Sequence, residues 1–358
     1  MNVIENPVNL AKKLISIPSI TGEESKVANY IFDYLRSIGL KPEFQKIAKN
    51  RNNIIVKGKD NLLITGHMDT VSFGGKWNYD PLGELTKTKL YGRGTCDTKG
   101  SIACILSALA KNPNKNISLS FTVDEEENFM GINSLMKLRN NKLKNIKYCI
   151  DLEPTGLRIV TAHKGQIRFN VSAKGKAAHS SVPQKGDNAI LKLTNVIPRI
   201  KSYSKKLNSK KHQLVGNPTT NIGVISGGSS YSTVPNYAEM LVDRRVIPGE
   251  DVKKVVTEFR RMLRPVKTST TQQHKPVDLN QNSPIIKQMQ SIIKKHKINP
   301  KPIGVKFTTQ FSIMAYNKIQ GFVFGVGNVN QAHKIDEYVF LKDVIKCHNI
   351  FSELVSTI

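Results

Sequence analysis

Residues 61–70 read NLLITGHMDT, a short apolar run followed by a glycine and then by a histidine and an aspartate two positions apart. The run is mostly apolar rather than alternating, which predicts a buried strand of an α/β sheet. Similar runs predict further strands, and helical spacing of apolar residues predicts helices around them. The predicted strands are 53–57, 61–65, 117–123 and 146–150, and the predicted helices are 7–15, 23–38 and 99–110. Thr21 is the predicted N-cap of the second helix. This alternation predicts a three-layer α/β domain with a mostly parallel or mixed sheet.

A different pattern begins near residue 162. Strand-like patterns occur at 166–173, 221–225 and 238–246, and helical spacing occurs at 187–200 and 251–263. This order predicts a smaller α/β sandwich inserted into the first domain. The insertion covers residues 162–273, and residues 1–161 and 274–358 form the first domain. The polar residues 265–280 predict a linker that returns the chain to the first domain, before a helix at 284–296, a strand at 321–325 and a helix at 341–357.

The composition is ordinary for a globular protein apart from its charge. The 358 residues include 54 Lys and Arg against 27 Asp and Glu, a formal net charge of +27. No apolar run reaches the ~18–20 residues of a membrane span, and Met1–Glu5 lacks the features of a signal peptide. Four scattered cysteines predict reduced thiols rather than a disulfide framework. We therefore expect a cytoplasmic protein that does not associate with membranes.

The positive charge is concentrated in the predicted insertion. Residues 161–273 contain 20 basic and 6 acidic residues, a net charge of +14, whereas the other 245 residues carry +13. Such an excess attracts polyanions, so the charge by itself leaves open a nucleic acid, an anionic membrane or an acidic protein as the partner. A solvated lysine-rich surface without a partner is the alternative.

Acids and histidines gather in five short segments at the ends of predicted strands. These are Gly66–Thr70 (GHMDT), Gly92–Gly100 (GRGTCDTKG), Asp124–Glu127 (DEEE), Asp151–Pro154 (DLEP) and Ala332–Glu337 (AHKIDE). Sites in α/β sheets are built at the C-terminal ends of the strands. Carboxylates gathered there repel one another unless a cation neutralises them. Imidazole and carboxylate ligands together suit zinc, cobalt or manganese.

Each segment also has an ordinary structural explanation. His67 could be a hydrogen-bonded polar residue, Asp97 a helix cap and Glu153 the end of a strand. The acidic run 124–127 could be a solvated helix start, and His333 could be a surface residue. The presence of all five segments in one chain, beside glycine or proline, favours a shared site.

In this order the five segments resemble the motifs of the co-catalytic di-zinc amidohydrolases and exopeptidases. That family includes carboxypeptidase G, the aminoacylases, acetylornithine deacetylase and succinyl-diaminopimelate desuccinylase. The resemblance covers nearly the whole chain, from IPSITGEE at 17–24 to AHKIDE at 332–337. It implies a hydrolase of linear amide bonds that holds two divalent metal ions, zinc or cobalt, in each subunit.

The resemblance also implies a role for each residue of the metal site. The implied ligands are His67 and Glu153 for one ion, Glu126 and His333 for the other, and Asp97 as the bridge. Asp69 would orient His67, and Glu125 would be the general base. The register within the acidic run follows from Gly131, because the family places a glycine five residues beyond the metal-binding glutamate.

The inserted segment resembles the lid and dimerisation domain of the family. KGKAAHS at 174–180, together with the serine that follows at 181, matches the KGxxxHxS motif. The match implies a homodimer in which His179 reaches the active site of the partner subunit and helps to stabilise the oxyanion. DRRVIPG at 243–249 matches the DxRxxPG motif, which implies that Arg245 binds a substrate carboxylate.

Two departures from the family pattern concern substrate recognition. Thr233 stands where many relatives carry Asn, and the segment around Gln310 lacks an Asp that relatives often have. Neither departure touches the implied metal ligands. Both argue against transferring the substrate of any one relative to this chain.

The charge favours one substrate class within the family. Some smaller members act in lysine and arginine biosynthesis and release the amino acid from an acidic amino-group carrier protein. The basic insertion would attract such a carrier, so we expect release of lysine, ornithine or both from it. The alternatives are a small-molecule N-acyl amino acid deacylase or a dipeptidase. A nucleic-acid-binding protein is disfavoured because the chain has no helix-turn-helix, zinc-finger or RNP-like motif and only 7% aromatic residues.

Overall fold

The computed structural model describes residues 6–358 in two compact units. Met1–Glu5, on which the expectation of no signal peptide rests, lies outside the described residues. The first unit contains the chain up to Thr161 together with 279–303 and 309–358, and the second contains 162–278 and 304–308. Each unit has its own hydrophobic core.

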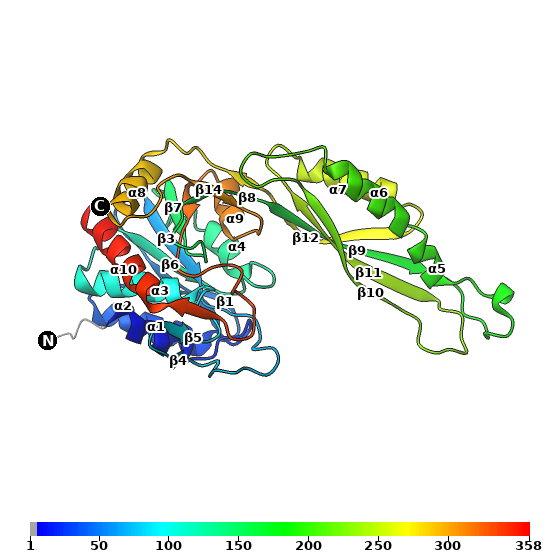
Figure 1. Cartoon of the computed structure of the whole chain (residues 1–358), viewed down its shortest axis with the longest axis horizontal. Coiled ribbons are helices and arrows are strands. Elements are labelled where there is room, and N and C mark those ends of the chain that lie inside the picture. The colour runs from blue at the N-terminus through cyan, green and yellow to red at the C-terminus, as the bar shows by residue number, and fades with distance from the viewer. Residues whose placement is uncertain (1–5) are drawn as a thin grey trace. The chain divides into compact units, whose positions relative to one another are not determined.

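A mixed nine-stranded sheet forms the centre of the first unit (Figure 1), and its residues 162–163, 277–278 and 304–305 fall within the ranges of the second unit. The strand order is β1-β2-β6-β3-β7-β15-β8-β13, and β14 also pairs with β8. The four central strands β6, β3, β7 and β15 are parallel. The bounds are β1 (Pro42–Ala48), β2 (Arg51–Val56), β3 (Leu62–His67), β6 (Ser118–Thr122), β7 (Tyr148–Asp151), β8 (Val160–His163), β13 (Val277–Asp278), β14 (Ile303–Val305) and β15 (Gln320–Val323). A separate small sheet contains β4 (Glu84–Leu85), β5 (Lys89–Tyr91) and β16 (Tyr338–Phe340).

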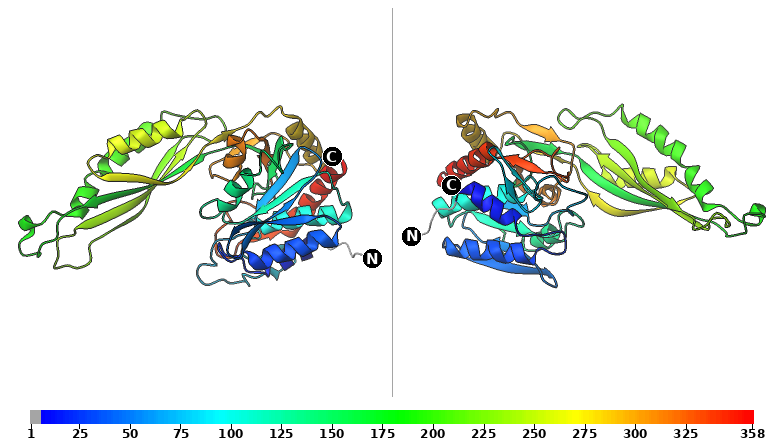
Figure 2. Two further views of the ribbon diagram at one scale, coloured as in Figure 1. Left: turned by 180° about the vertical axis from the view of Figure 1, so that it is seen from behind. Right: turned by 60° about the horizontal axis from the view of Figure 1, so that its bottom comes forward.

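Helices cover both faces of the large sheet (Figures 1 and 2). Leu62 and Ile64 of β3 point into a core shared with five helices, because alternate residues of a strand face the same side. These helices are α1 (Pro7–Ile15), α2 (Ser25–Ser37), α3 (Lys99–Lys111), α8 (Pro284–Lys295) and α10 (Leu341–Ser356). Leu63 points to the opposite side, where α4 (Met130–Met136) and α9 (Phe311–Tyr316) pack against each other. The predicted three-layer α/β domain is therefore confirmed.

The second unit is a two-layer sandwich. Its antiparallel sheet has the order β10-β11-β9-β12, with β9 (Gly165–Lys174), β10 (Thr219–Gly227), β11 (Tyr237–Val246) and β12 (Lys267–His274). One face carries α5 (Ala189–Thr194), α6 (Ile197–Leu207) and α7 (Val252–Met262), and a 3₁₀ turn lies at Pro183–Lys185. Ile167, Phe169 and Val171 of β9 point toward these helices, whereas Arg168 and Lys174 on the other face are exposed. The predicted α/β sandwich is confirmed.

Two local predictions for the second unit are wrong. Residues 267–274, predicted as part of a polar linker, form β12 and pair with β9. This strand lies at a sheet edge with most side chains partly or fully exposed, so it needs no apolar pattern. The single helix predicted at 187–200 is two helices, α5 and α6. Pro198 occupies the first turn of α6, the position where its missing N–H is tolerated, so a new helix begins there.

None of the helices in residues 6–358 is long and apolar enough to cross a membrane. Cys96, Cys104, Cys149 and Cys347 are free and buried, as expected from their spacing.

Candidate metal centre

The parallel strands of the first unit bring the predicted metal ligands to one edge of the sheet. His67 ends β3, Glu126 follows β6, Glu153 follows β7, and His333 lies in the segment after β15. Because these strands are parallel and adjacent, their C-terminal ends meet at the same edge. Asp97 comes from the loop between β5 and α3.

Asp97 lies between the two histidines. Its Oδ1 is 2.8 Å from Nε2 of His67, and its Oδ2 is 3.2 Å from Nε2 of His333. Burial alone would raise the pKa of Asp97, but hydrogen bonds to His333 and His67 hold it below its usual value. Hydrogen bonds to Asp97 and Glu126 raise the pKa of His333 to about 10. Thr98 is the N-cap residue of α3, so Asp97 is not the cap of that helix.

A glutamate completes the group around each histidine. Oε1 of Glu126 is 3.0 Å from Nε2 of His333, and Oε1 of Glu153 is 3.9 Å from Nε2 of His67. Glu127, the last acid of the run, is exposed. Ligand atoms of the group His67, Asp97 and Glu126 all lie within 4.8 Å of one another.

This group of residues fits a divalent cation. Oε1 of Glu153 is buried and has no hydrogen-bond partner among residues 6–358. An unpaired buried carboxylate oxygen is costly, and a cation held jointly with His67 would satisfy it. Nitrogen and oxygen donors of this kind suit zinc, cobalt or manganese.

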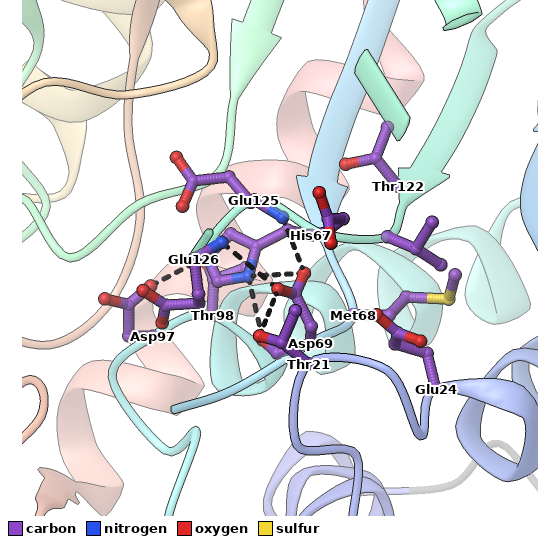
Figure 3. A network of polar contacts seen from close by, with 12 residues as sticks. Thr21, Glu24, His67, Met68, Asp69, Asp97, Thr98, Thr122, Glu125 and Glu126 are labelled. Carbon is purple, nitrogen blue, oxygen red and sulfur yellow. Dashed lines mark hydrogen bonds and ion pairs between the residues drawn. The ribbon is translucent and has the colours of Figure 1, made fainter. Parts of the chain in front are cut away.

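The carboxylate of Asp69 holds the loop that follows β6 (Figure 3). Its Oδ1 accepts a hydrogen bond from the backbone N–H of Glu125 at 3.0 Å, and its Oδ2 accepts one from Glu126 at 3.1 Å. Nδ1 of His67 lies 2.9 Å from the backbone oxygen of Asp69 and 3.6 Å from its Oδ1. The closest contact that orients His67 is therefore with the carbonyl of Asp69, while its carboxylate supports Glu125 and Glu126.

Thr21 contributes to this arrangement instead of capping a helix. Its hydroxyl donates to Oδ2 of Asp69 at 2.9 Å, and α2 begins only at Ser25 with Glu24 in the N-cap position. The prediction that Thr21 is an N-cap is therefore wrong. No local pattern in the sequence indicates the contact with Asp69, because the two residues are 48 positions apart.

Glu125 differs from the other acids of the site in its lack of partners. Its carboxylate forms no hydrogen bond or ion pair with any residue that the structure describes. Burial raises the pKa of Glu125 well above its usual value. His67 opposes this shift, and the neighbouring carboxylates of Glu126 and Asp97 increase it. The side chain is therefore available to move a proton.

A buried amide stands near the position where the family pattern has an aspartate. Nε2 of Gln310 donates to Oδ1 of Asp151 at 2.8 Å, and the hydroxyl of Thr122 donates to Oε1 of Gln310 at 2.8 Å. Burial raises the pKa of Asp151 to about 6, against hydrogen bonds from Gln310 and Thr309. Asp151 and Thr122 end β7 and β6, so this network fixes two strand ends that lead into the site. Its contacts span 159 and 188 positions, which the sequence pattern does not encode.

The other two predicted residues, His179 and Arg245, belong to the second unit. His179 is exposed, and its Nδ1 lies 2.7 Å from Oγ of Ser181. Nε of Arg245 donates to Oδ1 of Asp243 at 2.7 Å, and its Nη1 donates to the hydroxyl of Thr308 at 3.3 Å. These bonds orient the guanidinium, and its side chain is still 29% exposed.

Known proteins resemble this chain over most of its length. The model of the peptidase family M20/M25/M40 matches residues 63–357. A probable succinyl-diaminopimelate desuccinylase of Staphylococcus aureus is 30% identical over 393 residues, with 97% of this chain and 96% of the relative covered. An acetylornithine deacetylase of Aliivibrio salmonicida is 29% identical over 373 residues, with 96% of each chain covered.

Solved structures share the fold. A metallo-carboxypeptidase of the M20 family from Sulfolobus solfataricus matches with a TM-score of 0.83 and 20% identity over 98% of both chains. A tripeptidase from Staphylococcus aureus matches with a TM-score of 0.80 and 21% identity over 99% of both chains. The family model spans all of the implied metal ligands, from His67 to His333. The chain thus belongs to the peptidase family M20/M25/M40 and is a metal-dependent hydrolase.

Proposed function

We propose that this hydrolase cleaves a linear amide bond and releases lysine, ornithine or both from an acidic amino-group carrier protein. The observation that supports the proposal is the charge of the second unit, which contains 22 Lys and Arg against 7 Asp and Glu. The exposed lysines on its helices include Lys201, Lys205, Lys206, Lys253 and Lys254. A positive surface of this kind speeds encounter with an acidic protein, whereas a small substrate does not need it.

Two divalent cations, zinc or cobalt, are part of the proposal. His67 and Glu153 would hold one, Glu126 and His333 would hold the other, and Asp97 would contact both. When bound, such cations lower the pKa of water and stabilise the negative charge that develops on the amide oxygen.

Glu125 carries the proton in the proposed reaction. Its unpaired carboxylate accepts the proton of the attacking water and delivers it to the nitrogen of the leaving amino group. The raised pKa suits a group that must hold a proton between these two steps. The hydrogen bond from the backbone of Glu125 to Asp69 keeps its loop in place.

Arg245 would bind a carboxylate of the substrate. Its guanidinium is oriented by Asp243 and Thr308, and a planar fork suits a carboxylate. An Arg245→Lys substitution keeps the charge but loses this geometry. It should raise KM more than it lowers kcat.

We further propose a homodimer formed through the second unit. β10 is an edge strand, and Val224 and Ile225 in it are 50% and 51% exposed. An exposed apolar edge is a template for pairing with another strand, and a second copy of the chain would supply one. The exposed imidazole of His179 would then be available to the active site of the partner.

The dimer can be tested directly. Sedimentation equilibrium should give twice the mass of the chain, and Ile225→Lys should give the mass of a single chain. A wild-type protein that remains monomeric at micromolar concentration would rule out the dimer.

Hydrolysis of a small N-acyl amino acid is the second candidate function. The names of the two relatives above favour it, since one is a probable succinyl-diaminopimelate desuccinylase and the other an acetylornithine deacetylase. A dipeptidase belongs to the same class. On this alternative the positive surface has no role in substrate selection.

A panel of substrates distinguishes the two candidates. Enzyme loaded with zinc or cobalt is offered carrier-linked lysine, carrier-linked ornithine, acetylornithine and succinyl-diaminopimelate, and free amino acid is measured. We expect release from one or both carrier substrates, with kcat/KM at least about tenfold above that of either small substrate. Release from a small substrate only would overturn the carrier proposal and leave the hydrolase assignment intact.

A further inference from the structure

Glu337 connects the C-terminal part of the site to the loop that carries Asp97. It lies four residues after His333 and is completely buried. Its Oε1 accepts hydrogen bonds from the backbone N–H of Cys96 at 2.8 Å and of Asp97 at 3.3 Å. Its own carbonyl accepts one from Gly92 at 2.9 Å. One residue thus binds both ends of the loop from 92 to 97.

This loop depends on such contacts because its backbone is irregular. Gly92 and Gly94 have φ values of 144° and 88°, which side chains other than glycine rarely adopt. The loop has no strand or helix ladder to satisfy its N–H groups, and a buried N–H without a partner is costly. The carboxylate of Glu337 supplies a partner at Asp97 itself, the residue whose side chain lies between His67 and His333.

A buried cation accompanies this carboxylate. Oε2 of Glu337 accepts a hydrogen bond from Nη1 of Arg93 at 2.7 Å, and Arg93 is only 4% exposed. The remaining guanidinium donors bind the carbonyls of Ser72, Phe73 and Lys334. Buried ion pairs add little stability compared with apolar residues of similar volume. A contribution to folding stability therefore does not by itself explain why a charged pair lies at this position.

We infer that Glu337 is a positioning residue: it fixes the backbone of Asp97 so that one carboxylate can contact the cations of both histidines at once. The inference rests on the proposed metal site and adds Glu337 to the residues that shape it. The only sequence signal is the place of Glu337 at the end of the AHKIDE segment.

The test measures metal binding in Glu337→Gln, using the full chain. Glutamine keeps one acceptor oxygen but replaces the other oxygen by an NH2 group. In either orientation of the amide, this NH2 group faces Arg93 or the N–H groups of the loop, so one of the two sets of contacts is lost. Competition with a chromophoric chelator should show the affinity for Zn²⁺ reduced about 10- to 100-fold, a usual effect of removing a group that orients a ligand. The absorption spectrum of the Co²⁺-loaded variant should also change, because the geometry at Asp97 changes.

A matched control separates positioning from general destabilisation. Glu250 in the second unit pairs with the buried Arg244 at the same distance, 2.7 Å, and contacts none of the metal ligands. Glu250→Gln should lower stability but leave the Zn²⁺ affinity and the Co²⁺ spectrum unchanged. Glu337→Asp provides a second variant if Glu337→Gln does not fold. It retains the charge beside Arg93, but its side chain is too short to reach Cys96 and Asp97, and it should weaken Zn²⁺ binding as well.

Unchanged Zn²⁺ affinity and Co²⁺ spectrum in a folded Glu337 variant would overturn the inference. A wild-type chain that binds a single ion would contradict the proposed ion count instead. The Zn²⁺ affinity and the Co²⁺ spectrum of the Glu337 variants would then be measured for that single ion. The test still applies, because Asp97 contacts both histidines.

Discussion

At the scale of single residues, the acids of the metal centre divide by their partners. Asp97, Glu126 and Asp69 contact histidines or backbone N–H groups. Glu125 has neither kind of contact within residues 6–358. In the proposed mechanism the proton carrier must be an acid that no metal ion or hydrogen bond occupies, so this difference supports a separate role for Glu125.

Replacing Glu125 by glutamine should therefore separate metal binding from turnover. We expect the variant to retain the metal content of the wild type, because no metal contact is removed. Its kcat should fall by about 10²- to 10⁴-fold, the usual contribution of general acid–base catalysis. Metal analysis of the dialysed protein and steady-state kinetics check both parts. A fully active variant would exclude Glu125 as the base.

The residues of the site differ in how far the sequence identified them. His67, Asp97 and His333 stand in segments that the grouping of acids and histidines singled out, and the resemblance to the family implied their roles as ligands. Thr21 and Gln310 were missed because their roles depend on contacts with residues far away in the sequence. A hydroxyl or an amide in isolation carries no signal for such a contact.

At the scale of elements, β11 is joined to the turn before α7 by a buried ion pair. Nη2 of Arg244 is 2.7 Å from Oε1 of Glu250, and the side chains are 0% and 6% exposed. Glu250 also accepts a hydrogen bond from the backbone N–H of Ile247 at 3.0 Å. Burial would raise the pKa of Glu250, but the hydrogen bond and charge of Arg244 lower it overall.

The lowered pKa gives this pair a defined pH dependence. Its stabilising effect is complete above the unfolded-state pKa of about 4.3 and is lost as the pH falls through the lower pKa of the folded state. Glu250→Gln should lower the free energy of unfolding by about 3 kcal/mol at pH 7, because it leaves a buried guanidinium without its counter-ion. The difference from the wild type should shrink below pH 4.

Urea unfolding at pH 7 and at pH 3 measures this difference. Glu258→Gln, at an exposed position on α7, removes the same charge and serves as the control. A Glu250→Gln effect that persists unchanged at pH 3 would contradict an origin in the ion pair.

Helices and strands were predictable from the sequence where a single apolar pattern extended over the whole element. The buried strands β3 and β6 and the amphipathic helices α1 and α7 lie close to the predicted bounds. β12 was missed because an exposed edge strand has no apolar pattern to distinguish it from a linker. The break between α5 and α6 depends on a single proline within an otherwise helical pattern.

At the scale of the whole molecule, the net charge of +27 acts beyond any single contact. Its reach depends on salt, because the screening length shortens from about 30 Å at 0.01 M to about 8 Å at 0.15 M ionic strength. An effect on substrate encounter should therefore appear as a salt dependence that only acidic substrates share.

We expect kcat/KM for a carrier-linked substrate to fall by about tenfold or more between 0.01 M and 0.15 M salt. A small amide substrate should change much less over the same range. The double substitution Lys205→Glu and Lys206→Glu, at exposed positions on α6, should flatten the salt dependence for the carrier without affecting the small substrate. Equal salt effects on both substrates would count against a role for the charge.

The longer segment of the second unit, residues 162–278, begins and ends at one place. The carbonyl of Thr161 accepts a hydrogen bond from the N–H of Leu279 at 2.9 Å, and beyond them Ala162 pairs with Asp278 and His163 with Val277. Because the two ends of this segment lie side by side, the segment interrupts the first unit at a single place. During evolution it can be acquired, lengthened or exchanged as one piece, while β3, β6 and β7, the strands that lead to the predicted metal ligands, keep their order in the sheet. If the second unit selects the substrate, as proposed, substrate choice can then change without any change in the strands that lead to the metal site.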